Sequence, residues 1–145
     1  MGLHGDFHMK NVMRVEGESM LIDMDTLTAG DPIFDLQGIY MTYREFGEDE
    51  PGNTMSFLGI DERMSEYVWR KSLADYFGTE DANILTCAAD RIRLVAAMRF
   101  LTYLDPADAE GDSLNARRIR HTTANIRELL TRTDSLLLDA PGGAR

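Results

Sequence analysis

HGDFHMKN, the sequence from His4 to Asn11, decides the fold of this chain together with IDMD at residues 22–25. The two stretches bring an acid, Asp6, an amide, Asn11, and two further acids into a short span. Such a set suits phosphoryl transfer, in which catalysis consists mostly of positioning and charge neutralisation. One carboxylate orients the attacking hydroxyl and accepts its proton, while an amide oxygen and a second carboxylate hold magnesium against the phosphates. We therefore expect a phosphoryl-transfer site near the start of the chain.

The residues between the two stretches predict a β-hairpin. Residues 12–15 and 20–22 are apolar and partly β-branched, and the intervening turn contains Gly17, which tolerates positive φ. Antiparallel pairing brings the start of one strand beside the end of the other, so Asn11 and Asp23 should form one metal site. The alternative is a surface hairpin with incidental polar ends.

These motifs resemble those of the aminoglycoside phosphotransferase and choline kinase superfamily. Residues 4–11 resemble its catalytic loop, in which His-Gly-Asp is followed by an Asn at the Asp-x-x-x-x-Asn spacing of protein kinases. LIDMD at residues 21–25 is similar to the metal-binding segment, and GDPIFDL at residues 30–36 to a segment whose Asp braces the catalytic loop. The resemblance extends from residue 3 to about residue 45, with three motifs in the family's order.

The resemblance implies a role for each polar residue of the motifs. Asp6 would be the catalytic base, and Asn11 and Asp23 would hold Mg²⁺ against ATP, the phosphoryl donor. Asp35 would be mostly buried and accept backbone amides of the catalytic loop; the alternative is a solvated helical Asp. His4 would help to fix the loop.

Two residues of the motifs keep open alternatives. Asp25 either binds a second Mg²⁺ or a metal-bound water, or it caps a turn. His8 either reaches the transferred phosphate as a cation or hydrogen-bonds to the loop. A zinc site is not expected, because His4 and His8 have no third ligand at a recognisable spacing and His121 is isolated.

The composition limits the classes of partner. A length of 145 residues with 43% hydrophobic residues suffices for one core, so we expect one domain. The net charge of −10 argues against nucleic acid, and it suits either a cationic substrate or simply a soluble surface. The single Cys87, the absence of a signal peptide and the absence of a long apolar run predict a cytoplasmic protein without a membrane partner.

Hydrophobic periodicity predicts helices in the rest of the chain. We expect them at about 32–44, 61–77, 80–104 and 113–133, with a polar loop at 45–54. The helix at 80–104 is the most apolar, so it should lie at the centre of the core, with Cys87 as a buried small residue. Residues 136–138 are expected to dock on this core.

The predicted fold class is mainly α within α+β: a protein-kinase-like C-terminal lobe, built as a helical bundle with a small β-hairpin that carries the catalytic loop. Residues 1–30 would form the catalytic loop and metal-binding hairpin, residues 31–138 the helical subdomain, and residues 139–145 a frayed tail. The catalytic loop begins at residue 4, and no Gly-rich phosphate loop with alternating strands follows later. We therefore expect the C-terminal lobe alone, without an N-terminal lobe.

The resemblance implies that the whole enzyme moves the γ-phosphoryl group of ATP to a hydroxyl of a small molecule similar to an aminoglycoside, choline or a sugar. Residues 1–145 alone are expected to be inactive, and the interface left without its N-terminal lobe should favour self-association or binding of such a lobe. The alternative is a non-catalytic, truncated or split-protein lobe that acts as a binding module.

Overall fold

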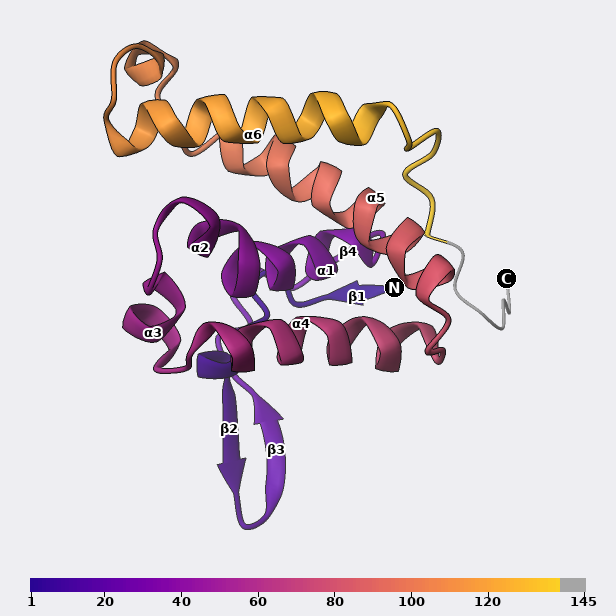
Figure 1. Cartoon of the computed structure of the whole chain (residues 1–145). Helices are drawn as coiled ribbons and strands as arrows, with labels where there is room; N and C mark the ends of the chain where they lie inside the picture. Colours follow the sequence, from indigo (N-terminus) through magenta and orange to yellow (C-terminus); the bar gives the residue numbers. More distant parts are fainter. Residues whose placement is uncertain (139–145) are drawn as a thin grey trace.

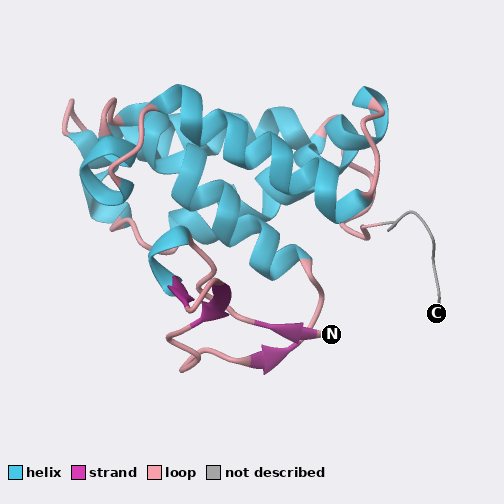
Figure 2. Cartoon of the chain, turned by 90° about the horizontal axis from the view of Figure 1, so that it is seen from below, coloured by secondary structure: helices cyan, strands magenta, loops and turns pink. Residues whose placement is uncertain are grey.

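The structure is a computed structural model and describes residues 1–138. The described chain is mainly helical, with two small antiparallel sheets on one side of the helices (Figure 2). This agrees with the predicted mainly α class. The predicted tail, residues 139–145, lies outside the described residues. No helix of the described part is long and apolar enough to cross a membrane.

The strands belong to two separate pairs. They are β1 (Gly2–Leu3) with β4 (Thr28–Ala29), and β2 (Val12–Val15) with β3 (Glu18–Leu21). The predicted hairpin is confirmed, although its turn is only two residues long, with φ of 52° at Glu16 and 92° at Gly17. Two successive positive φ angles fit the tight turns that match the twist of antiparallel strands. Every residue of β2 and β3 is exposed, and the hairpin projects from the helices (Figure 1).

The helical part follows β4 without interruption by further strands in the described residues. Its elements are α1 (Ile33–Tyr40), the π-helical turn η2 (Met41–Glu45), α2 (Phe46–Asp49), α3 (Asn53–Leu58), α4 (Glu62–Phe77), α5 (Ala82–Leu101) and α6 (Leu114–Leu130). Two 3₁₀ turns, η1 (Met9–Asn11) and η3 (Pro106–Ala109), complete the set. Side chains of Asp61, Asp81 and Ser113 accept first-turn backbone amides, so they cap α4, α5 and α6.

Helix α5 lies at the centre of the core, as predicted. Ile92 and Ala96 have no exposed surface, and α5 packs against both α1 and α6 (Figure 1). The aromatic ring of Phe100 on α5 meets the ring of Phe46 at 5.2 Å between centroids. Leu138 packs against this core, whereas Leu136 and Leu137 are exposed, so the expected docking of residues 136–138 is confirmed for Leu138 only.

The prediction for Cys87 was wrong. The thiol is exposed, because α5 turns the adjacent Ala88 toward the core instead. A helix that is apolar on several faces does not reveal from its sequence which face is covered, since periodicity gives only relative directions.

The predicted polar loop at residues 45–54 was wrong for most of its length. The chain continues from α1 through η2 into α2 as far as Asp49, and α3 begins at Asn53, so only residues 50–52 connect helices. Glu45 is 4% exposed and Phe46 packs against the core, so this segment is held by tertiary contacts. Its acidic residues belong to a helix terminus that contacts α6, not to a solvated loop.

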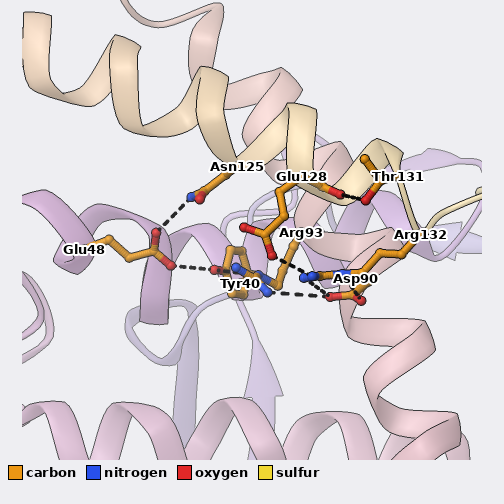
Figure 3. A network of polar contacts seen from close by, with 8 residues as sticks. All are labelled: Tyr40, Glu48, Asp90, Arg93, Asn125, Glu128, Thr131 and Arg132. Atoms are coloured by element: carbon orange, nitrogen blue, oxygen red, sulfur yellow. Dashed lines mark hydrogen bonds and ion pairs between the residues drawn. The ribbon is translucent and has the colours of Figure 1, made fainter.

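Polar contacts join this segment to α5 and α6 (Figure 3). The hydroxyl of Tyr40 donates to Glu48 Oε1 at 2.7 Å and accepts from Arg93 Nε at 3.2 Å. Asn125 Nδ2 on α6 donates to the second carboxylate oxygen of Glu48 at 3.3 Å. Burial, reinforced by the charge of Glu48, raises the pKa of Glu45 to about 7. Charged and polar groups therefore link α2, α5 and α6, and the buried Glu45 beside them has a pKa near neutral pH.

Candidate active site

Residues 4–11, the loop predicted to be catalytic and called the catalytic loop below, are fastened to α1 by Asp35. Its Oδ2 accepts the backbone N–H of His4 at 2.9 Å, and its Oδ1 accepts that of Gly5 at 2.7 Å. These contacts are the ones expected of a brace for the loop. The residue is of intermediate burial, with most of its surface covered, which agrees with the expectation that it is mostly buried. Its position at the edge of the helical body, where α1 begins, leaves it in reach of solvent.

A second set of contacts joins the loop to the chain after the hairpin. His4 is buried, and its Nε2 lies 3.0 Å from the carbonyl oxygen of Ile22. The hydroxyl of Thr26 donates to the carbonyl oxygen of His4 at 2.5 Å. Gly5, at φ of 83°, packs so closely here that a Cβ would come within 2.9 Å of Thr26 Cβ. Both its conformation and its surroundings therefore require glycine.

Asp6 is held from one side by Asn11. The Nδ2 of Asn11 donates to the backbone oxygen of Asp6 at 2.9 Å and to its Oδ2 at 3.3 Å. Asn11 itself is buried, whereas the Asp6 side chain is 55% exposed. These contacts use the amide nitrogen of Asn11, so its oxygen is the atom available to a metal. The loop thus presents a fixed carboxylate to the surface.

His8 lies near the same carboxylate oxygen of Asp6, Oδ2, that accepts the hydrogen bond from Asn11. Its Nε2 is 3.6 Å from Asp6 Oδ2, a separation that suits an ion pair better than a hydrogen bond, and its Nδ1 is buried without a partner among the described residues. The ring contacts Phe57 edge-on at 5.6 Å. Neither alternative for His8, phosphate contact or loop hydrogen bond, is decided by this placement.

The hairpin register brings Asn11 and Asp23 to the same end. Val12 pairs with Leu21, and the N–H of Ile22 donates to the carbonyl oxygen of Asn11 at 2.9 Å. Asp23 is exposed and adopts a left-handed conformation, with φ of 60°, which is uncommon outside glycine. Asp25, two residues on, is also exposed.

The donors around this end match one kind of metal site. Within residues 1–138 no group of three or more His, Cys, Asp and Glu side chains is arranged to hold an ion. Mg²⁺ commonly takes only one or two protein oxygens and completes its shell with phosphates and water. Asn11 and Asp23 supply that number and type of ligand, so the residues present fit magnesium held jointly with a nucleotide.

Sequence reasoning missed one residue that positions the loop. Tyr43, in the π-helical turn η2, is buried, and its hydroxyl oxygen accepts the N–H of Met9 at 3.1 Å. This contact holds the 3₁₀ turn that ends at Asn11. Tyr43 counted only as an apolar helical position in the sequence, and no local signal marks the role of its hydroxyl.

A cavity of about 280 Å³ opens beside Asp6. It is bounded by the catalytic loop, α1, η2 and α5, and its lining includes Phe7, Gln37, Phe57 and Arg99. A larger hollow of about 660 Å³ lies between α4 and α5, but none of its lining residues belongs to the catalytic loop. The smaller cavity is therefore the one from which a bound molecule can reach the Asp6 carboxylate.

Comparison with known proteins identifies the part of the chain that carries this site. Residues 2–71 match the family model of the phosphotransferase enzyme family (APH). The matched segment runs from β1 into α4 and contains every motif residue discussed above, which confirms the resemblance inferred from the motifs. Searches of curated proteins and of solved structures gave no significant match.

Proposed function

We propose, from the match of residues 2–71 to the model of the phosphotransferase enzyme family, that this chain supplies the catalytic lobe of an enzyme that transfers the γ-phosphoryl group of ATP to a hydroxyl of a small molecule. The domain would be a kinase-like C-terminal lobe, with residues 1–30 as its catalytic part and residues 31–138 as its helical part.

The observation that carries the proposal is the fixation of Asp6. Asp35 holds the residues before it, and Asn11 holds its backbone and carboxylate, while the side chain stays accessible beside a cavity. A base that orients a hydroxyl must be preorganised and reachable in this way. Asp6 would accept the proton of the substrate hydroxyl. The hydroxyl oxygen would then form a bond to the γ-phosphorus while the bond from that phosphorus to the leaving ADP breaks.

Asn11 and Asp23 would hold Mg²⁺, whose charge neutralises the phosphates when the nucleotide is bound. The left-handed backbone of Asp23 supports a functional role, because such conformations concentrate at active sites. Asp25 would contribute a further ligand, directly or through water. His4 would fix the loop, and His8 would support it or the phosphate.

The exposed apolar side chains near the hairpin support a partner surface. They are Met9, Val12, Met13, Val15, Met20, Leu21, Met24 and Leu27. The hairpin residues among them alternate between its two faces, since Val12 pairs with Leu21 and Met13 with Met20. Large exposed apolar areas often mark interaction sites. We propose that an N-terminal lobe, or a second copy of this chain, covers these side chains. We also propose that the enzyme is cytoplasmic.

The test is transfer of labelled phosphate from ATP, with Mg²⁺, by the complete gene product that contains this chain. Asp6→Asn should lower the rate by at least ~100-fold, the range of a lost general base. Asp112→Asn is the control, because that side chain is fully exposed and remote from the motifs. Full activity in Asp6→Asn would refute the assignment, and an inactive complete product would favour the alternative of a non-catalytic binding module.

A further inference from the structure

The cavity beside Asp6 contains one acid and one base among its lining residues. The acid is Asp6 and the base is Arg99, which α5 contributes. If Asp6 orients the hydroxyl, no second carboxylate of the lining remains to bind a cationic group of the substrate. The acidic character of the whole chain, with its net charge of −10, therefore does not extend to the interior of this cavity.

Arg99 is an exposed residue, so it lies at the rim of the cavity, and its terminal nitrogens can donate to a bound molecule. Its Nε donates to the hydroxyl oxygen of Tyr103 at 3.0 Å, which orients the guanidinium, and Tyr103 also lines the cavity. No carboxylate of residues 1–138 forms an ion pair with Arg99. A guanidinium with free terminal nitrogens is the preferred protein partner of a carboxylate, since it can form two parallel hydrogen bonds.

Gln37 is a second unpaired group in the cavity wall. The residue is 1% exposed, and its Nε2 donates to the carbonyl oxygen of Phe34 at 2.9 Å, which fixes the orientation of the amide. Its Oε1 is buried and has no hydrogen-bond partner among the described residues. Buried polar atoms rarely lack a hydrogen-bond partner, so we expect a donor from outside the chain to bind this oxygen.

We propose that this cavity binds a small hydroxylated carboxylic acid that also carries an N–H or O–H donor, a hydroxylated amino acid being the simplest case. The hydroxyl lies at Asp6, the carboxylate at Arg99, and the additional donor faces Gln37 after a small adjustment of the wall. The aromatic rings of Phe7 and Phe57 cover the carbon skeleton. This inference rests on the proposed function for the role of Asp6, and it replaces the substrate of net positive charge suggested by the acidic chain with a substrate that carries a carboxylate.

Binding by residues 1–145 tests the inference without requiring turnover. Two pairs of compounds differ by one carboxylate: L-serine and ethanolamine, and L-homoserine and 3-aminopropan-1-ol. Each is titrated into isotope-labelled protein, and chemical-shift changes are followed by NMR. The acids should bind at least about tenfold more tightly than the amines, and the shifts should centre on Gln37 and Arg99.

Variants locate the carboxylate contact. Arg99→Gln should weaken binding of the acids about tenfold, with little change for the amines, and Arg99→Lys should restore part of the affinity because it keeps the charge. Arg127→Gln on α6 is the matched control, an exposed arginine outside the cavity lining. Thermal melts of each variant verify the fold.

The outcomes separate this inference from the proposed function. Tighter binding of the amines, equal binding within each pair, unchanged affinity in Arg99→Gln, or no binding by any of the four compounds would each overturn the hydroxy-acid assignment, whatever the enzyme activity. Selective binding of the acids without phosphate transfer by the complete gene product would leave the cavity assignment standing and overturn the kinase function.

Discussion

The hydroxyl oxygen of Tyr43 accepts a hydrogen bond from the backbone N–H of Met9 at 3.1 Å, across 34 residues of sequence. Tyr43 sits in the π-helical turn between α1 and α2, and Met9 opens the 3₁₀ turn that leads to Asn11. Turns of π-helix are rare and occur frequently at functional sites. This one directs the side chain of Tyr43 toward the catalytic loop.

Tyr43→Phe removes that acceptor and leaves the N–H of Met9 without its partner. We expect a loss of about 1 kcal/mol in the free energy of unfolding, measured by chemical denaturation. In the complete enzyme kcat should also fall, and by more than unfolding of part of the protein would explain. The reason is that the turn bearing Asn11 is held less firmly. Tyr67→Phe, at a residue that is 60% exposed, is the control and should change neither quantity.

Asp35→Ala leaves the backbone N–H groups of His4 and Gly5 without acceptors. The expected loss of unfolding free energy is about 1–3 kcal/mol, somewhat moderated by the partial exposure of the site. Denaturation of Asp35→Asn should give a smaller loss, because the amide retains one acceptor oxygen. Stability equal to that of the unchanged chain in Asp35→Ala would contradict the brace role.

Asp23→Asn should lower turnover of the complete enzyme strongly and raise the Mg²⁺ concentration needed for half-maximal rate, because it removes a charge that faces the metal. Asp25→Asn, two residues away, provides the comparison. An Asp25 that only caps a turn would leave the Mg²⁺ requirement unchanged, whereas a second metal ligand would shift it. Identical Mg²⁺ curves for Asp23→Asn and the unchanged enzyme would exclude Asp23 as a ligand.

The buried Glu45 predicts a dependence of stability on pH. Its pKa is raised from 4.5 to about 7 by burial first and the charge of Glu48 second. The folded state therefore binds more protons than the unfolded state between these two values, and stability should decrease as pH rises through this window. Glu45→Gln should flatten that decrease and increase the unfolding free energy at pH 8 by about 1–3 kcal/mol.

The control for this effect is Glu110→Gln, an exposed glutamate whose replacement should leave the slope unchanged. Thermal denaturation between pH 5 and pH 8 gives the comparison. A slope that persists in Glu45→Gln would contradict the assignment of this pH dependence to Glu45.

Residues 1–145 alone should show no appreciable transfer from ATP to aminoglycosides, choline, hydroxylated amino acids or small alcohols. The catalytic loop supplies only part of the contacts that align a γ-phosphate with a hydroxyl, and a misplacement of about 1 Å can cost ~100-fold. Turnover at ordinary kinase rates that Asp6→Ala abolishes would disprove this, and it would mean that a dimer or an unrecognised segment completes the nucleotide site.

Local signals in the sequence predicted the parts of the fold that depend on local physics. The helices expected at about 61–77 and 113–133 begin within one residue of α4 and α6, because hydrophobic periodicity is a property of neighbouring residues. The hairpin followed from β-branched residues around Gly17, and the order of polar residues placed Asp35 at the loop. These features depend on neighbours within a few residues or on a recognisable motif.

The errors concern residues whose surroundings come from distant parts of the chain. Glu45 looks like part of an acidic loop, but Phe46 beside it packs on Phe100, more than 50 positions away, and draws the segment into the helical body. Cys87 lies on a helix that is apolar on several faces, and only the arrangement of α1 and α6 decides which face is covered. Tyr43 likewise gains its role from Met9, which lies 34 positions away in the sequence.

The exposed thiol on α5 has a practical consequence. Cys87 is the only cysteine in 145 residues, so a maleimide fluorophore or spin label attaches at a single position without any engineered substitution. The site lies outside the catalytic loop and outside the linings of both hollows described above, so the attached dye can report docking of a second lobe or copy without blocking either. The same thiol can join two chains covalently in air, and sedimentation measurements of self-association therefore need a reducing agent to separate oxidative cross-linking from association through the apolar face.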